Sequence, residues 1–349
     1  MNTQELLDAA RGGDEAAFGR LVEKHRAELQ AHCYRMLGST PDAEDALQET
    51  LLRAWRALSG FEERSSLRSW LYAIATNACL KAIERRPSRV LPIDYGPAAD
   101  PHDGPGEPLL ESVWVDPYPD GALGLEEGLT TPEARYEQRE SVELAFIASV
   151  QHLPARQRAV LILREVLGFS AGEVAGMLDT TADAVYSALQ RAHKAVDERL
   201  PEQSQQTTLR ALGDDGVREI VERFVDAWDR SDVDAVAALL AEDAIMEMPP
   251  IPTWYRGRNA VADFLRGWPL SVTGRFRMLP TWANGQPALA HYEWDGEAAL
   301  FRPHGMTVLT LRGDRIAELT SFLAPEIPGR FGLPGAYPAD SSTRPDVQS

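Results

Sequence analysis

Cysteine is almost absent from this chain of 349 residues, which contains only Cys33 and Cys79. Two cysteines exclude a disulfide framework, and we expect both thiols to lie in helical cores of a cytoplasmic protein. No run of about 18 apolar residues occurs, so the sequence predicts no membrane span. The first ten residues lack a cationic stretch followed by an apolar one, so no signal peptide is expected.

Basic residues are also scarce, with 35 Lys and Arg against 53 Asp and Glu and a formal net charge of −18. This balance excludes a polycation that holds nucleic acid by phosphate neutralisation alone. The acidity is concentrated in residues 87–132, which hold 1 basic and 9 acidic groups together with nine prolines and six glycines. Such a segment buries too little apolar surface to offset its ordering entropy, so we expect an acidic linker.

The length predicts two or three domains, each with its own core. We expect a multi-domain fold: two all-α domains, the second with a helix-turn-helix, followed by an α+β domain. The boundaries follow the changes in composition. They give residues 1–86, the linker 87–132, a second helical block at 133–200, a domain at 209–325 and a flexible tail at 326–349.

The first block contains a helix from Ala43 to Leu58, because its apolar residues recur with the i, i+3, i+4 spacing of one helix face. The opposite face carries Asp45, Gln48, Glu49, Leu52 and Arg56. Leu52 stands there among charged residues. It is either a scattered surface leucine or part of a face that binds a partner.

A second helix is predicted from Leu67 to Glu84, followed by Arg85 and Arg86. Basic groups at that end complement the helix dipole. The helix also interleaves basic residues with Trp70 and Tyr72, a combination that suits single-stranded nucleic acid. The residues alone leave both interpretations open.

Residues 133–200 predict a helix bundle. Its first two helices are expected from about Glu133 to His152 and from about Ala155 to Leu167, and it ends in a short helix, Glu173 to Leu178, a tight turn and a longer helix. This pattern is typical of a helix-turn-helix, whose second helix enters the DNA major groove. An ordinary helical hairpin is the alternative. The polar face expected to contact bases consists of Thr181, Asp183, Tyr186, Ser187, Gln190, Arg191 and Lys194.

The order of these parts resembles the extracytoplasmic-function (ECF) sigma factors of bacterial RNA polymerase. The resemblance rests on GDEAAFGRLVEKHRAEL, DAEDALQETLLRAW, GFEERSSLRSWLYAIATNAC and LPARQRAVLILREVLGFSAGEVAGML followed by TADAVYSALQRAHKAV. It implies that the face with Leu52 docks on the polymerase core and that the helix-turn-helix reads the −35 element. It also implies −10 recognition by Arg64, Ser65, Ser66, Arg68, Trp70, Asn77, Lys81 and Arg85. On this analogy the acidic linker threads a channel that later holds RNA; a disordered tether is the alternative.

Residues 209–325 place helices before strand-like runs, which indicates an α+β domain with helices on one face of a curved antiparallel sheet. The expected strands are 244–248, 274–279, 288–294, 298–302, 306–311 and 316–322. The pattern resembles the SnoaL-like cone. The residues expected to line a pocket in it are Phe224, Met246, Met248, Trp254, Trp282, His291 and Trp294. Phe224 and Met248 occupy the positions of the Tyr and Asp of ketosteroid isomerases, so that chemistry is not expected. No cofactor is expected, and no metal, because His291 and His304 lack ligand spacing.

The leading hypothesis is a promoter-specificity subunit of RNA polymerase without catalysis of its own, regulated by the C-terminal domain. Its expected partners are the polymerase core, promoter DNA and a small-molecule ligand of that domain, with no membrane. The alternative is a SnoaL-type cyclase, isomerase or hydrolase fused to DNA-binding helices. A ligand-responsive repressor is a third possibility, but it leaves the first 86 residues unexplained.

Overall fold

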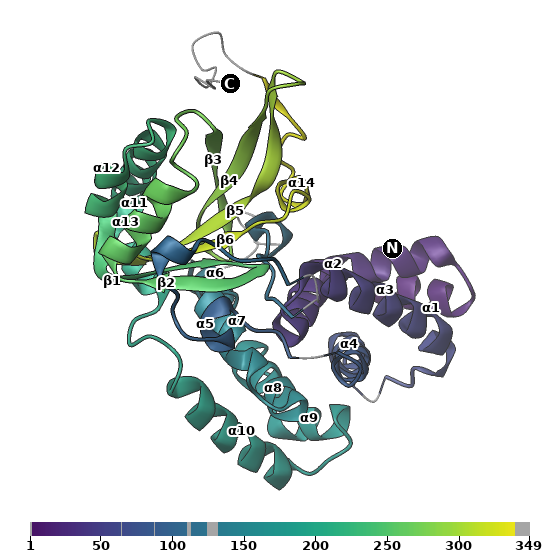
Figure 1. The fold of residues 1–349 in the computed structure, drawn as a ribbon. Coiled ribbons are helices and arrows are strands. Elements are labelled where there is room, and N and C mark those ends of the chain that lie inside the picture. The colour runs from purple at the N-terminus through teal and green to yellow at the C-terminus, as the bar shows by residue number, and fades with distance from the viewer. Residues whose placement is uncertain (1, 64, 87, 110–112, 124–131, 339–349) are drawn as a thin grey trace. The chain divides into compact units, whose positions relative to one another are not determined.

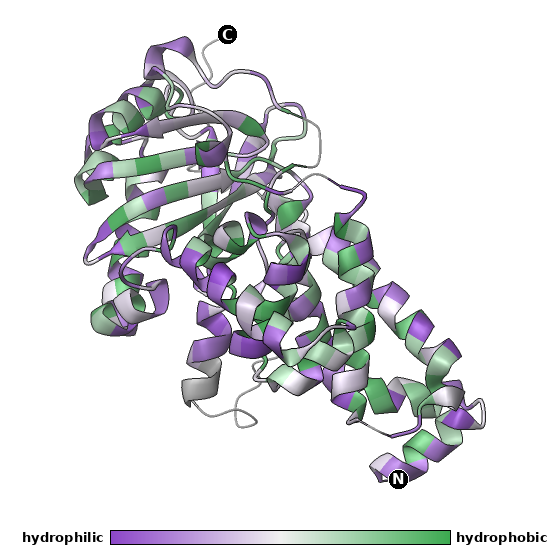
Figure 2. Cartoon of the chain, turned by 90° about the horizontal axis from the view of Figure 1, so that it is seen from below, coloured by the Kyte–Doolittle hydropathy of each residue, from purple (hydrophilic) through white to green (hydrophobic). Residues whose placement is uncertain are grey.

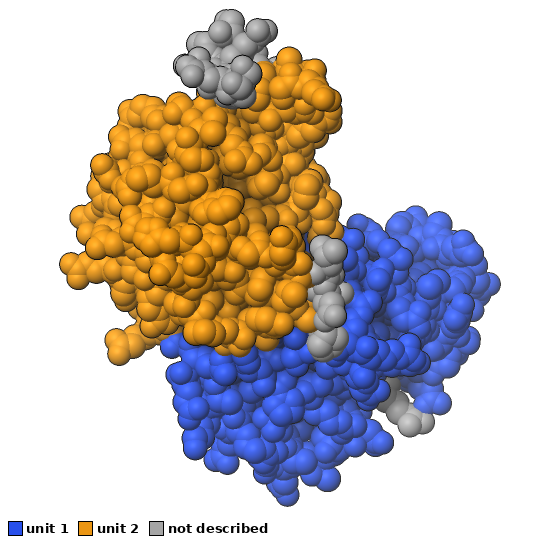
Figure 3. All heavy atoms as spheres, in the orientation of Figure 1, with its two compact units in different colours: residues 1–89, 121–200 blue, residues 90–120, 201–349 orange. Residues whose placement is uncertain are grey.

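A computed structural model describes residues 2–63, 65–86, 88–109, 113–123 and 132–338 (Figure 1). The contacts divide the chain into two compact units, coloured separately in Figure 3. The first unit is Met1–Arg89 with Gly121–Leu200, and the second is Val90–Asp120 with Pro201–Ser349. Among the described residues, no helix has both the length and the apolar character needed to cross a bilayer.

The N-terminal part of the first unit is helical, and each of its long helices begins at a side-chain cap. Its elements are α1 (Thr3–Arg11), α2 (Glu15–Leu37), α3 (Thr40–Ala57), a 3₁₀ turn η1 (Leu58–Gly60) and α4 (Leu67–Ile83). Asn2, Asp14, Ser39 and Ser66 each accept a hydrogen bond from a backbone N–H of the first turn, which satisfies a donor that the helix leaves unpaired. Cys33 and Cys79 are fully buried in this core.

The second helical block differs from the expected pair of long helices. Its elements are α6 (Pro132–Glu140), α7 (Leu144–Gln151), α8 (Ala155–Leu161), a π turn η4 (Ile162–Val166), α9 (Ala171–Met177) and α10 (Ala182–Asp197). The helix expected from Glu133 to His152 is broken between α6 and α7. The chain departs from the helix there because the Arg35 guanidinium of α2 donates hydrogen bonds to both the carbonyl and the hydroxyl oxygen of Ser141. The pair α9 and α10 forms the predicted helix-turn-helix.

The second unit is an α+β domain built on one mixed sheet. Its helices are α11 (Gln205–Asp229), α12 (Val233–Leu239), α13 (Arg258–Gly267) and α14 (Ile327–Arg330). Its strands are β1 (Leu240–Met248), β2 (Ile251–Arg256), β3 (Phe276–Ala283), β4 (Gln286–Asp295), β5 (Leu300–Arg312), β6 (Arg315–Phe322) and β7 (Tyr337–Pro338). The strand order is β2-β1-β6-β5-β4-β3, and β7 pairs with β5. Hydrophobic and hydrophilic residues alternate along these strands (Figure 2).

Three details of this sheet correct the sequence expectation. The sheet is mixed rather than antiparallel, because β1 pairs in parallel with β6. The expected strands at 298–302 and 306–311 form the single long strand β5, and β2 was not anticipated after the Pro249-Pro250 pair. The tail expected to be flexible from residue 326 contains α14 and β7, with Ile327 buried. Residues 339–349 lie outside the described residues.

Most of the acidic segment, residues 90–120, belongs to the second unit and packs against residues beyond 200. Its described residues form α5 (Pro92–Tyr95) and the 3₁₀ turns η2 (Pro101–Asp103) and η3 (Asp120–Leu123). Trp114, Val115 and Tyr118 are buried. The composition correctly indicated that the segment lacks a core of its own. The apolar surface that the segment lacks comes from residues 201 onward, which begin about 80 positions after the segment ends at residue 120.

Arg158 of α8 is a buried polar connection between the two helical blocks of the first unit. Its side chain is 2% exposed, and its guanidinium donates to the carbonyls of Met36 of α2, Gln151 and Leu153. Burial lowers the pKa of Arg158 to about 10, so the group stays protonated near neutral pH.

Replacing Arg158 by Met is therefore expected to leave buried carbonyls unpaired and to lower the free energy of unfolding by about 3 kcal/mol. Denaturant unfolding followed by far-ultraviolet circular dichroism measures this change. The control is Arg139→Met on α6, an exposed arginine whose loss should change the free energy by less than about 0.5 kcal/mol. Equal unfolding curves for the two variants would contradict the assignment.

Candidate nucleic-acid interface and C-terminal cavity

The face of α3 singled out from the sequence is exposed in the structure. All five of its residues are exposed: Asp45, Gln48, Glu49, Leu52 and Arg56. The opposite side of the helix, with Ala43, Leu47 and Ala54, is buried. Leu52 is 50% exposed. Leu52 is thus an exposed apolar side chain in a row of polar and charged ones, as the sequence predicted.

Helix α4 presents some of the residues expected to read the −10 element and buries others. Ser65, Ser66, Asn77, Lys81 and Arg85 are exposed, and Arg64 lies outside the described residues. Trp70 is not free to stack on a base, because its ring packs on Phe61 with centroids 4.8 Å apart. Sequence spacing placed Trp70 among the basic residues, but α4 is too buried for all of its aromatics to face outward.

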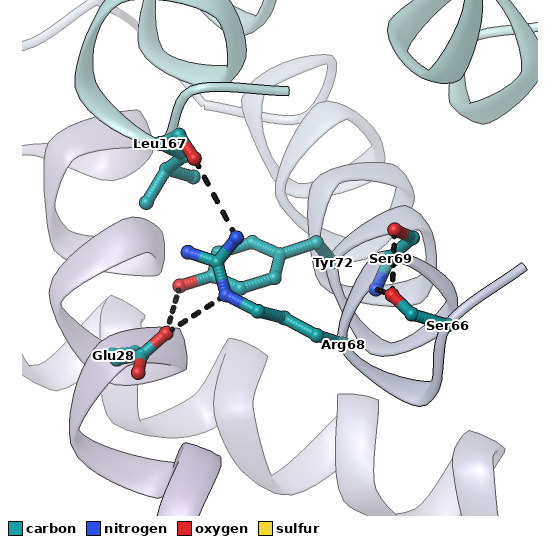
Figure 4. Close-up of polar contacts among 6 residues, drawn as sticks. All are labelled: Glu28, Ser66, Arg68, Ser69, Tyr72 and Leu167. Atoms are coloured by element: carbon teal, nitrogen blue, oxygen red, sulfur yellow. Dashed lines mark hydrogen bonds and ion pairs between the residues drawn. The ribbon is translucent and has the colours of Figure 1, made fainter. Parts of the chain in front are cut away.

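Arg68 of α4 is held by groups from both helical blocks (Figure 4). Its guanidinium lies 4.9 Å from the ring centroid of Tyr72 and 4.8 Å from that of Phe169. It donates to the Glu28 carboxylate at 3.2 Å and to the Leu167 carbonyl at 3.5 Å. Tyr72 also donates to Glu28 at 3.2 Å, and burial raises the pKa of its phenol. Arg68 therefore makes cation–π contacts with two aromatic rings and an ion pair with one carboxylate.

Two further contacts join α4 to the helix-turn-helix. The Ser69 hydroxyl donates to the Glu173 carboxylate of α9 at 3.2 Å. The Asn77 amide donates to the Met177 carbonyl at 3.4 Å, as well as to Ala73 within α4. Hydrogen bonds from Ser170 and Ser69 lower the pKa of Glu173, which keeps the carboxylate ionised. In this structure Arg68 and Asn77, both expected to recognise the −10 element, bind the second helical block.

Helix α10 leaves its predicted base-reading face open. Thr181, Asp183, Tyr186, Ser187, Gln190, Arg191 and Lys194 are all exposed. Thr181 caps the helix by accepting the N–H of Ala184 at 3.2 Å. The buried side holds Val185, Ala192 and Val196, so the amphipathic pattern positions the polar face as the sequence predicted.

The second unit contains a cavity of about 180 Å³ between its sheet, its helices and the acidic segment. Most of its walls are apolar. The lining residues are Pro105, Trp228, Met246, Met248, Ile251, Phe264, Trp268, Pro269, Arg275, Phe276, His291, His304, Ser321 and Leu323. Of the residues expected to line a pocket, Met246, Met248 and His291 do so.

The other four expected pocket residues lie outside this lining. Phe224 is buried in the core and packs on Trp228, whereas Trp282 is 43% exposed. Trp294 packs on Phe301, and Trp254 donates to a backbone carbonyl of the acidic segment. The sequence marked these residues as large and apolar but could not say to which side of a strand each would point.

Four polar side chains that line the cavity, His291, Ser321, Arg275 and His304, bond to other protein groups. His291 Nε2 lies 2.6 Å from the Thr307 hydroxyl, which lies 2.7 Å from the Ser321 hydroxyl. Burial lowers the pKa of His291 to about 3, so the imidazole is neutral. Glu293 accepts from His304 at 3.1 Å and from Arg275 at 2.7 Å, and these bonds lower the pKa of its carboxyl group to about 2. No group of three or more side chains suited to a metal occurs within the described parts of the chain.

One end of the acidic segment is hydrogen-bonded along β1 and β2. Ile93 N–H donates to the Glu247 carboxyl at 2.9 Å. The Trp254 indole donates to the Gly96 carbonyl at 2.7 Å, and the Trp254 carbonyl accepts the N–H of Ala99 at 2.9 Å. Further on, Leu109 N–H donates to the Pro250 carbonyl at 2.9 Å and Tyr255 donates to the Gly104 carbonyl at 3.0 Å.

The other end of the segment is held at the turn between β3 and β4. Tyr118 and Asn284 exchange two hydrogen bonds, at 2.8 and 2.9 Å. Asp120 accepts the N–H of Gly285 at 2.7 Å. We call residues 90–109 and 113–120 the held segment. No local sequence signal identified its anchors Glu247, Trp254 and Asn284, because each contacts residues about 150 positions away.

Comparison with known proteins gives three family matches along the chain. Residues 21–89 match sigma-70 region 2, residues 143–196 match sigma-70 region 4, and residues 221–319 match a SnoaL-like domain. The ECF RNA polymerase sigma factor SigG of Mycobacterium tuberculosis (strain ATCC 25618 / H37Rv) is 41% identical over 333 residues, covering 95% of this chain and 86% of that protein. The chain belongs to the ECF sigma factors of RNA polymerase.

Other ECF and sigma relatives show how the parts are shared. The RNA polymerase sigma-H factor of Pseudomonas aeruginosa is 28% identical over 197 residues, which cover 93% of that protein but 56% of this chain. The crystal structure of the M. tuberculosis extracytoplasmic function sigma factor SigJ has the same fold, with a TM-score of 0.56 at 22% identity, covering 88% of this chain and 97% of that one. Sigma factors are not enzymes, which agrees with the aligned positions held by Phe224 and Met248.

A buried carboxyl group makes the stability of this sigma factor depend on pH. Burial and the neighbouring Glu318 carboxyl raise the pKa of Glu247 to about 8. The folded chain therefore keeps a proton that the unfolded chain releases near pH 4, so the free energy of unfolding falls as the pH rises from about 4 to about 8.

We expect Glu247→Gln to remove most of this fall and to raise the free energy of unfolding at pH 8 by about 2 kcal/mol, because Gln still accepts the Ile93 N–H without a buried charge. Denaturant unfolding followed by tryptophan fluorescence measures it, since six of the eight tryptophans lie in the second unit. Glu242→Gln, on the exposed side of β1, is the control. A pH dependence that survives Glu247→Gln would refute the prediction.

Proposed function

We propose that this chain directs promoter-specific transcription initiation in the cytoplasm by binding the RNA polymerase core and promoter DNA. The exposed face of α3 binds the core, α4 with residues 65–66 recognises the −10 element, and the exposed face of α10 reads the −35 element. The observation that supports this assignment is that two polar helix faces, one on α3 and one on α10, are both exposed. The chain that carries them has a net charge of −18. A chain with that charge needs a cationic partner to hold DNA.

Leu52 and Tyr186 test the two faces separately, since they are 50% and 55% exposed and lie on different helices. We expect Leu52→Ala to weaken binding to core polymerase roughly tenfold, because an apolar contact at the centre of an interface is lost. Tyr186→Ala should leave core binding unchanged and reduce transcription from promoters with an intact −35 element. Each variant controls for the other, measured by core-binding titration and run-off transcription. Equal effects of both variants on core binding would contradict the assignment.

We also assign a regulatory role to the C-terminal domain, which restrains initiation by holding the linker. The support is the set of hydrogen bonds at both ends of the held segment. A segment that must thread a polymerase channel is unavailable while its backbone is paired with β1, β2 and the β3–β4 turn. The held segment must then be released before initiation. The free energy required for this release lowers the fraction of molecules that can initiate transcription.

Weakening one anchor should therefore raise activity. Trp254→Phe keeps an aromatic ring in the core but removes the donor to Gly96, a loss of about 1 kcal/mol. We expect initiation to rise about fivefold at a subsaturating concentration of the chain, and amide exchange at Ala99 to rise by a similar factor. Run-off transcription and hydrogen exchange measure the two effects.

Trp282→Phe is the matched control, because this tryptophan is exposed and is not one of the anchors of the held segment. A truncation after Thr208 removes the domain and should raise output further at the same promoters. Unchanged output from both the truncation and Trp254→Phe would exclude a direct regulatory role, and reduced output would reverse its sign.

A further inference from the structure

The turn between β3 and β4 is buried, although the loops that connect strands usually lie at the surface. Ala283 pairs with Gln286, so Asn284 and Gly285 form a two-residue loop, which we call the Asn-Gly turn. Their φ angles of +57° and +68° are those of a type I′ turn, in which this pair of residues is favoured. Asn284 is fully buried, and Gly285 is buried as well. Other parts of the chain therefore cover the turn.

The end of the held segment covers one side of the Asn-Gly turn. The Tyr118 N–H donates to the side-chain oxygen of Asn284 at 2.8 Å, and the Asn284 N–H donates to the Tyr118 carbonyl at 2.9 Å. The Gly285 N–H donates to the Asp120 carboxylate at 2.7 Å. Pro119 forms an isolated bridge with Ala283. After Asp120 the chain enters the first unit, so this is where it leaves the second.

The start of α11 also binds the turn, at the point where the chain has returned to the second unit from residue 201 onward. The Gln206 amide donates to the Gly285 carbonyl at 2.7 Å. The neighbouring Gln205 donates to the Leu311 carbonyl of β5 at 2.6 Å and accepts the Leu311 N–H at 2.8 Å. Both glutamines are buried. Gly213 has a φ of +69° and interrupts the helix, so residues 205–212 form a short helical piece of their own.

Gly285 joins the two sets of contacts, because its N–H bonds to Asp120 and its carbonyl bonds to Gln206. Each bond restricts the backbone dihedral angles of the same glycine, which is otherwise freer than any other residue. One bond therefore favours the geometry that the other needs, which is a coupling free energy between the two contacts. Residues 121–205 lie between these contacts and include the stretch that matches sigma-70 region 4, residues 143–196.

We infer that Gln206 is a positioning residue: it fixes the Asn-Gly turn in the conformation that binds the end of the held segment. The two ends of the region 4 stretch are then held by one turn and released together. The inference rests on the proposed function only for its effect on initiation, since the coupling through Gly285 is a property of the second unit.

Gln206→Met in the full chain keeps the volume of the side chain and removes its donor. We expect amide exchange under native conditions to rise about fivefold at Tyr118 and Gly285, because the Gly285 carbonyl loses its partner and the turn opens more often. The control is Thr307→Val in the middle of β5, which removes buried hydrogen bonds to His291 and Ser321. The control should leave exchange at both amides within about twofold. Unchanged exchange in Gln206→Met, or an equal rise in the control, would overturn the inference.

The reverse substitution tests the coupling from the other end. Asp120→Ala removes the acceptor of the Gly285 N–H, and coupling between two contacts is reciprocal. Exchange at Leu311, whose N–H bonds to Gln205, should therefore rise about threefold. Unchanged exchange at Leu311 would show that the two ends are released independently and would overturn the inference. This variant also decides the matter if Gln206→Met does not fold, which its spectrum would reveal.

Run-off transcription then connects the turn to initiation. We expect Gln206→Met to raise initiation about fivefold at a subsaturating concentration of the chain, as Trp254→Phe does. If exchange changes as expected but neither variant alters initiation, the positioning role stands and the regulatory proposal fails. If Trp254→Phe raises initiation while Gln206→Met changes neither exchange nor initiation, the regulatory proposal stands and the positioning role fails. Faster exchange in Gln206→Met with a rise in initiation only for Trp254→Phe would overturn the link between the turn and initiation.

Discussion

The structure of the second unit depends on the burial of an acidic, proline-rich segment against a domain that begins after residue 200. The segment holds few apolar groups, and Trp114, Val115 and Tyr118 are buried. Its other backbone groups are satisfied by β1, β2 and the turn that contains Asn284. Apolar contacts alone would not order the segment, because its composition provides too little apolar surface to offset the loss of chain entropy. The hydrogen bonds from residues beyond 200 therefore contribute to its order.

One of the groups that bond to the segment is a buried carboxyl. Glu247 accepts an N–H of the held segment, yet burial beside Glu318 raises its pKa to about 8, so ionisation is unfavourable close to neutral pH. Because the folded chain keeps a proton that the unfolded chain releases, this carboxyl group makes the stability of the second unit depend on pH.

In the first unit, two residues that the sequence predicts to recognise the −10 element contact the second helical block. Arg68 donates to the Leu167 carbonyl and Asn77 donates to the Met177 carbonyl. These contacts are few and long, at 3.5 and 3.4 Å, whereas Arg158 forms a buried network between the blocks. These contacts leave the polar faces of α3 and α10 exposed.

The sequence by itself determined the helical faces, the helix-turn-helix and the order of domains, because these follow from periodicity, caps and motifs that lie within one element or one block. It indicated the exposed positions on α3 and α10 residue by residue, but only three of the seven pocket residues. Tertiary structure alone decided the partner of the acidic segment, the parallel pairing of β1 with β6, and the roles of Glu247 and Trp254. The physical reason is distance along the chain: a contact between residues about 150 positions apart depends on which surfaces remain unpaired after each element has folded, and no local pattern records that.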